Sequence, residues 1–187
     1  MYARKLRKQS SLLKSIDLAA QFCPFVEHLS LAHLGVRSTS PQFIDNISPV
    51  SAARITSLDI SGSPPFLSKT CLRGPLTLFK NLRHFIFKSG NTAVDDLDAL
   101  QKFFSVIHRT IVTLDLFGVG SVNVTVLESL SECSRLQVLK LPTLKNFCPF
   151  YIRNFIAKTS LQGCCYRKLR LMCAEISFFG DSDEGAG

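Results

Sequence analysis

The sequence predicts an α/β solenoid in which parallel strands lie side by side, and two features predict it. The first is an apolar spacing, clearest in Cys133–Leu141, which places leucines at relative positions 1, 4 and 6. Positions 4 and 6 of a strand point to the same side, so each strand needs neighbours to bury that side. The second is that helical patterns with short links separate these strands, which favours parallel pairing.

The same spacing returns along most of the 187-residue chain, with steps of 29, 27, 29, 25 and 30 residues between first positions. A period in this range with an L-x-x-L-x-L spacing is typical of leucine-rich repeats. We therefore predict a short right-handed arc with about six parallel strands on its concave side and helices or irregular segments on its convex side. The copies are Val26/Leu29/Leu31, Ile55/Leu58/Ile60, Leu82/Phe85/Phe87, Ile111/Leu114/Leu116, Leu136/Leu139/Leu141 and the weaker Tyr166/Leu169/Leu171.

At these residues the chain resembles the cysteine-containing repeats of F-box/leucine-rich-repeat proteins, and more loosely the ribonuclease-inhibitor type. The resemblance is strongest at Cys23–Leu31 and Cys133–Leu141, where a cysteine precedes position 1 by three residues. The resemblance implies a protein-recognition role. One candidate that it suggests is the substrate-recognition part of a ubiquitin-ligase adaptor, with ligase subunits as partners. The family's asparagine or cysteine three residues past position 6 is replaced, so we expect the side-chain ladder of the turns to be missing or displaced. That place holds Leu34, Ser63, Gly90, Val119 and Leu144.

Composition favours one repeat domain over residues 11–179, flanked by a basic flexible stretch, 1–10, and an acidic flexible tail, 180–187. The chain is 46% hydrophobic and carries a net charge of +8. Its seven cysteines form no C-x-x-C motif, and no secretory signal pattern opens the sequence. We therefore predict reduced thiols and a cytoplasmic protein, with the nucleus as an alternative, and no membrane span.

Between the strands, apolar spacing and proline positions predict the connecting elements. The pattern predicts a helix over residues 12–22, a second over Pro41–Val50 that Pro49 interrupts, and an irregular or briefly helical connector from Ser61 past Pro75. It also predicts a helix over Asn91–His108 that begins with a capping box at Thr92 and Asp95. Shorter helices are expected over Val126–Ser131 and over Phe147–Ala157, the last packing beneath the final strand.

Positions 3, 5 and 7 of each repeat face away from the core and should line a concave sheet about 25 to 30 Å wide. Several of them are apolar where solvent would favour polar residues, and basic residues border them, which is typical of a binding surface. Phe117 is the strongest candidate anchor, and Lys140 and Arg170 would favour an acidic partner. The predicted partner-binding residues are His84, Ile86, Lys88, Asp115, Phe117, Val138, Lys140, Lys168 and Arg170.

Other readings of the same residues stay open. The apolar positions could be covered by the chain's own tail, with Phe178 and Phe179 as candidates. A nucleic-acid binder would use the basic clusters Arg4–Lys8 and Arg167–Arg170 with Lys140, although we rank nucleic acid below protein. The chain could also be a structural piece of a longer solenoid.

Enzymatic chemistry and cofactors are not predicted. The four histidines are scattered, and no serine or cysteine lies in a nucleophile motif. The cysteine spacing fits no usual zinc pattern, so we predict no metal site. Asp59 and Asp115 would stand about 10 Å apart, with one strand between them, and we expect them to form a solvated acidic spot.

Overall fold

The protein is an α/β fold built on a parallel sheet. The computed structural model describes residues 25–32, 47–88, 96–120, 122–142, 144–147, 150–151, 153–155, 157, 170–173 and 176–178, with side chains described outside 144–147, 170–173 and 176–178. The predicted basic stretch 1–10, the helix over 12–22, the tail 180–187 and Lys168 lie outside these residues.

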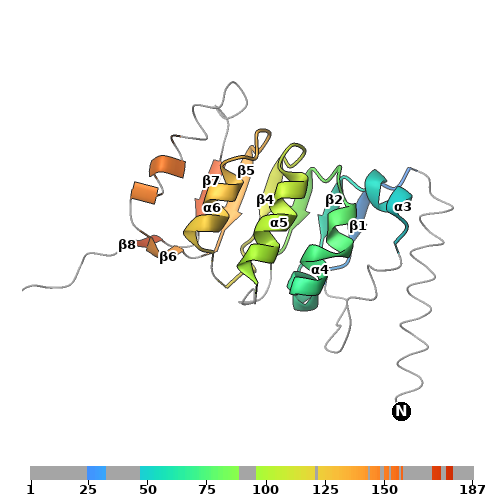
Figure 1. Ribbon diagram of the computed structural model, residues 1–187, viewed down its shortest axis with the longest axis horizontal. Helices are drawn as coiled ribbons and strands as arrows, with labels where there is room; N and C mark the ends of the chain where they lie inside the picture. Colours follow the sequence, from blue (N-terminus) through green and yellow to red (C-terminus); the bar gives the residue numbers. More distant parts are fainter. Residues whose placement is uncertain are drawn as a thin grey trace, which may run out of the picture.

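Six short strands form one sheet in their order along the chain. Every neighbouring pair is parallel, which confirms the predicted pairing. Helices α4 (Lys69–Arg73), α5 (Leu97–Ile107) and α6 (Val124–Leu130) lie on one side of the sheet (Figure 1). The strands are β1 (His28–Ser30), β2 (Ser57–Asp59), β3 (His84–Ile86), β4 (Thr113–Asp115), β5 (Val138–Leu141) and β7 (Arg170–Cys173).

One hydrogen-bond pattern joins the strands and recurs at each step from β1 to β5. At the start of the strands, the carbonyl at position 2 accepts from two successive amides of the next strand. The Glu27 carbonyl, for example, accepts from Thr56 N at 2.8 Å and Ser57 N at 3.0 Å, and the carbonyls of Thr56, Arg83 and Val112 repeat this arrangement. The regularity keeps equivalent residues of neighbouring strands side by side.

Positions 1, 4 and 6 of the repeats build the core. Leu58, Leu114 and Leu139, all at position 4, are 0% exposed, as predicted. On the helix side, the apolar face of α5 closes over them, and the rings of Phe85 and Phe103 lie 5.1 Å apart between centroids in a tilted arrangement. Burying side chains of this size contributes about 1.5–3 kcal/mol each.

Helix α5 begins later than the capping-box pattern predicts. Its N-cap is Asp96, whose Oδ1 accepts from Ala99 N at 2.9 Å, whereas 91–95 lie outside the described residues. Asp96 Oδ2 also lies 3.2 Å from both Lys69 Nζ and Arg73 Nη2 of α4. The Ala99 amide first, and then Lys69 and Arg73, lower the pKa of the Asp96 carboxyl. The cap therefore also ties α4 to α5.

Two other connectors contain proline-led helices. Residues 41–46 of the helix predicted over Pro41–Val50 lie outside the described residues. Pro49, which was predicted to interrupt that helix, is instead the first residue of α3 (Pro49–Arg54), where its missing amide hydrogen has no cost. The second connector, predicted to be irregular or briefly helical, consists of three short helical pieces and is helical over most of its length. It contains the 3₁₀ helices η1 (Pro64–Leu67) and η2 (Pro75–Leu78), which flank α4.

The region after β5 departs from prediction. Leu144–Phe147 forms strand β6, which the sequence did not predict and which includes Phe147, the first residue of the helix predicted over Phe147–Ala157. Strand β6 pairs in parallel with β8 (Ile176–Phe178) in a separate two-stranded sheet. The backbone of Phe178, one of the two residues considered as a cover for the main sheet, is thereby paired with β6. The other, Phe179, lies outside the described residues. Residues 150–151, 153–155 and 157 are helical, in agreement with that part of the prediction, and Phe155 is buried.

The last strand of the main sheet is shifted by two residues from the predicted register. Arg170 pairs with Val138 and Met172 with Lys140, so Arg170 occupies position 3 instead of position 5. A two-residue shift keeps the alternation of faces, whereas a one-residue shift would reverse it. The pattern at Tyr166–Leu171 therefore predicts the strand but places it two residues too early.

Candidate functional site

The candidate site is the face of the main sheet opposite the helices, which we call the open face: the residues at positions 3, 5 and 7 of β1 to β5. The register aligns position 3 in one row across the sheet and position 5 in a second. The first row is His28, Ser57, His84, Thr113 and Val138, and the second is Ser30, Asp59, Ile86, Asp115 and Lys140. The predicted residues of β3, β4 and β5 are thus brought onto three adjacent strands.

Half-buried apolar side chains lie near the middle of this face. Ile86, Val138 and Phe117 are each intermediate in exposure, neither buried in the core nor fully exposed. Ile86 and Asp115 are register partners, and Val138 is aligned with Thr113 on the next strand. Three of the apolar positions predicted for this face are therefore neither in the core nor fully exposed.

The backbone fixes Phe117 where β4 ends. Its amide donates to Asp115 Oδ1 at 3.3 Å, and the next amide, of Gly118, donates to the Phe87 carbonyl at 2.7 Å. A Cβ on Gly118 would lie 2.7 Å from the Phe87 ring and 2.9 Å from the Phe87 carbonyl oxygen, so only glycine permits this approach. Phe117 is thus held on a turn that is anchored to the neighbouring strand.

Asp115 is a buried carboxylate rather than the solvated acidic spot expected from sequence. The residue is 1% exposed, and its Oδ2 lies 3.4 Å from Lys140 Nζ. A buried charge is costly unless it is paired and hydrogen-bonded, and Asp115 has both kinds of partner. Lys140 is consequently occupied in an ion pair with β4, which weakens its predicted role in attracting an acidic partner.

Asp59 occupies the same repeat position on β2 and makes the equivalent turn contact. Its Oδ1 accepts from Ser61 N at 2.9 Å, two residues on. Ser61 is itself buried, and its Oγ accepts from Lys88 N at 2.9 Å. These side chains fix the strand ends, while Lys88 remains exposed at the edge of the open face.

His84 is half-buried in the first row, close to other positive groups. Burial, and then His28 and Arg83, lower the pKa of the His84 imidazole from its ordinary value of 6.5. The side chain is therefore mainly neutral at pH 7, so it offers the open face a hydrogen-bonding ring without a positive charge.

Arg170 lies in β7 in register with Val138, and its side chain is not among those described. Of the residues named for nucleic-acid binding, Lys140 pairs with Asp115, and residues 4–8 and 167–169 lie outside the described part of the chain.

Side-chain bonds between repeats replace part of the expected ladder. Ser63, three residues past position 6, is buried and its hydroxyl donates to the Leu31 carbonyl of the previous repeat at 3.1 Å. At the opposite edge, Asn81 Nδ2 donates to the Ala53 carbonyl at 2.7 Å. At Ser63 the place predicted to lose the ladder thus keeps a hydroxyl bond to the previous repeat, whereas the Asn81 bond lies at the other edge, where no ladder was predicted. The serine at position 63 was the available sequence signal.

The cysteine chemistry of the described residues is that of the core. Cys71 and Cys133 are fully buried. Burial, with Glu132 nearby, raises the pKa of the Cys133 thiol to about 12, so the thiol stays protonated and is a poor nucleophile. Among the described residues, no three His, Cys, Asp or Glu side chains gather in a way that could hold a metal ion. No helix in this part of the chain is long and apolar enough to cross a membrane.

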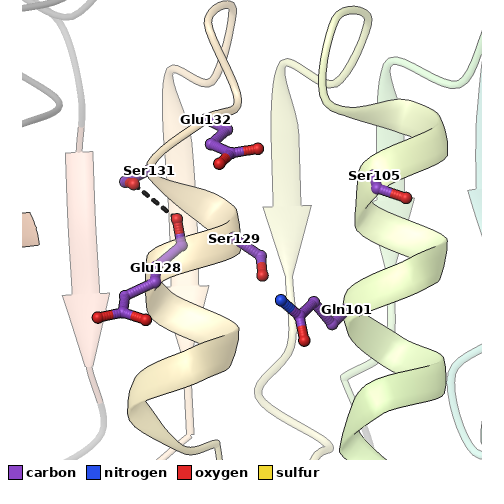
Figure 2. A pocket seen from close by; sticks show the side chains of 6 residues that line it. All are labelled: Gln101, Ser105, Glu128, Ser129, Ser131 and Glu132. Carbon is purple, nitrogen blue, oxygen red and sulfur yellow. Dashed lines mark hydrogen bonds between the residues drawn. The ribbon is translucent and has the colours of Figure 1, made fainter.

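Two hollows were not predicted from sequence. One, of about 380 Å³, lies between α5 and α6 (Figure 2) and is lined by polar side chains. There Ser131 Oγ donates to the Glu128 carbonyl at 2.6 Å. The other, of about 620 Å³, lies where the strands begin and contains three arginines, Arg54, Arg83 and Arg135. Each of the three lies directly beside position 1 of its repeat. This recurrence could have been found in the sequence, but the apolar pattern used to find the strands gives no weight to basic residues.

Comparison with family models, with curated proteins and with solved structures finds no match to this chain.

Proposed function

We propose that this chain is a leucine-rich-repeat recognition module without enzymatic activity, which binds another protein through the open face. The observation that carries the proposal is that the strands pair in the same register at each step and present partly exposed apolar side chains on one face. Ile86 and Val138 stand on β3 and β5, and Phe117 stands two residues beyond the end of β4, between them. Backbone hydrogen bonds fix the spacing of these three strands. Aromatic and aliphatic side chains at the centre of a patch with a polar border are typical of binding hot spots.

The mechanism follows from rigidity. Because turn contacts such as that of Asp115 with the Phe117 amide hold the contact residues in place, little conformational entropy is lost when a partner binds. Lys88 is exposed at the same edge and adds a charged contact at the border, where charges influence association rate and specificity.

The finer proposal is that the partner is a substrate of a ubiquitin ligase and that the chain is part of its adaptor, in the cytoplasm or the nucleus. It is supported by the resemblance to cysteine-containing repeats. The full burial of Cys133, three residues ahead of position 1, agrees with the apolar filling role of that cysteine.

The test is proximity labelling in cells with wild type, Phe117→Ala and a matched control, Phe150→Ala. Phe150 is 62% exposed and lines a hollow with Val124 and Leu127 of α6, on the helix side of the sheet and away from the open face. We expect Phe117→Ala to lose a set of partners that wild type and Phe150→Ala both retain. Identical partner sets for all three proteins would reject the open face as the binding surface. Loss of ligase-adaptor subunits or their substrates from the set would support the finer proposal.

A further inference from the structure

The edge of the main sheet where the strands begin carries a row of basic side chains. Arg54 and Arg135 directly precede position 1 of their repeats and Arg83 follows it, and all three line one hollow of about 620 Å³. Lys80 and Arg109 directly precede Asn81 and Thr110, which line the same hollow, and both are exposed. We call these five basic residues the basic edge.

The excess charge of the described side chains lies at this edge. These side chains include eleven Lys or Arg and seven Asp or Glu. The basic edge holds five of the eleven, and Glu27 in the hollow is one of the seven. The remaining six basic and six acidic residues balance. The positive potential of the described part is therefore local, which is the pattern expected of a surface that attracts an anionic partner.

Four of the five cations of the edge are also available. Lys69, Arg73 and Lys140, which lie elsewhere, are committed to carboxylates. Lys80, Arg83, Arg109 and Arg135 form no ion pair with any described carboxylate. Asn81 Nδ2 and Thr110 Oγ1 donate to main-chain carbonyls of the preceding repeat, at 2.7 and 3.3 Å. These hydrogen bonds fix the repeats relative to one another beside these cations.

The dimensions of the edge decide between anionic partners. From Arg54, ahead of β2, to Arg135, ahead of β5, three strand spacings amount to about 14 Å. An extended peptide covers that length with four or five residues, and its alternate side chains present two or three carboxylates to one side. Sites for single-stranded nucleic acid usually take at least about 4 nucleotides and a longer groove. Glu27 inside the hollow would also repel a continuous phosphate backbone, whereas a peptide can place a neutral or basic residue there.

We infer that the basic edge binds a short acidic segment of a partner protein in an extended conformation, through paired contacts of Arg83 and Arg135 with carboxylates. Arginine suits this role because its planar guanidinium donates two parallel hydrogen bonds to one carboxylate. The site is distinct from the open face, since Arg83 stands at the start of β3 and Phe117 beyond the end of β4.

The test measures fluorescence anisotropy of a labelled eight-residue peptide of alternating Glu and Ser against the full chain at low salt. The variant is Arg83→Glu/Arg135→Glu. The matched control is Lys102→Glu/Arg153→Glu, which makes the same change in net charge at exposed residues away from the hollow. Circular dichroism checks that each variant folds. If the charge-reversed variant Arg83→Glu/Arg135→Glu does not fold, the neutral variant Arg83→Gln/Arg135→Gln takes its place. An eight-nucleotide oligo-dT serves as the competing probe.

We expect wild type to bind the peptide, and the variant to lose about tenfold or more in affinity while the control stays within about twofold. Phe117→Ala should bind the peptide as wild type does, so this result is independent of the function proposed for the open face. Three results would overturn the inference: no peptide binding by wild type, equal losses in variant and control, or oligo-dT binding that is tighter than peptide binding and depends on Arg83 and Arg135. The last would assign the edge to nucleic acid.

Discussion

The ion pair between Asp115 and Lys140 makes a sharp prediction because its two members are buried to different extents. The Asp115 side chain is 2% exposed and that of Lys140 is 27% exposed. Removing one partner of a buried pair costs about 3–5 kcal/mol, because an uncompensated charge stays behind. Lys140→Met leaves the carboxylate buried with one amide donor, so we expect a loss near the lower end, about 3 kcal/mol. For a chain of this size that corresponds to a fall in Tm of about 6–12 °C.

The reverse substitution should cost less. Asp115→Asn keeps an oxygen for the Phe117 amide and leaves a lysine that can reach water, so we expect a loss of about 1 kcal/mol. Asp115→Asn/Lys140→Met removes both charges and should recover most of the loss of Lys140→Met. Urea denaturation followed by circular dichroism measures all three, with Lys102→Met as an exposed control expected within about 0.5 kcal/mol of wild type. If Lys140→Met costs no more than Lys102→Met, or the double variant is the least stable, the carboxylate is not buried as described.

Two further predictions concern the core and the pH dependence. Phe103→Ala opens a cavity beside Phe85 and should lower the free energy of unfolding, measured by urea denaturation, by about 3–5 kcal/mol. Phe150→Ala, on the surface, should lower it by well under half of that amount. Equal losses for the two variants would contradict the packing of Phe103 in the core. The pKa of His84 is lower in the folded protein than its ordinary 6.5, so the unfolded chain takes up the proton first and stability falls as pH decreases through 6.5. His84→Gln should flatten the slope of the urea midpoint between pH 7 and 5, and an unchanged slope would count against the burial of the imidazole.

The strands could be placed from sequence because burial and alternation act on the same residues. When a strand in a parallel array has apolar residues at positions 4 and 6, the stable arrangement buries both of them on the same side of the sheet. Leu58 and Leu139, at position 4, are buried in this way. Position 5 is different, because alternation predicts only which face it occupies. The burial of Asp115 depends on Lys140 of the next strand, 25 residues away, and no local pattern contains that information.

The start of helix α5 and the second sheet could not be predicted from the sequence, for a related reason. Thr92 and Asp96 are both suitable N-caps by residue type. Asp96 has a contact that the local pattern does not include, since Lys69 and Arg73 reach it from α4. Likewise, Leu144–Phe147 has a mixed apolar pattern, and its strand conformation goes with pairing to Ile176–Phe178, about thirty residues further on. In each case an interaction between distant segments selects among local alternatives.

The repeat separates three surfaces by position alone. Positions 1, 4 and 6 enter the core, positions 3, 5 and 7 form the open face, and the basic residues around position 1 form the basic edge. Arg83, at position 2 ahead of β3, and Phe117, at position 7 beyond β4, are five positions apart along the strand direction and one strand apart across the sheet. The two offsets together amount to about 17 Å. Substitutions farther apart than about 7–10 Å usually have additive effects. Phe117→Ala and Arg83→Glu should therefore act independently on any partner that contacts both surfaces, and strong non-additivity would mean that the open face and the basic edge belong to one site.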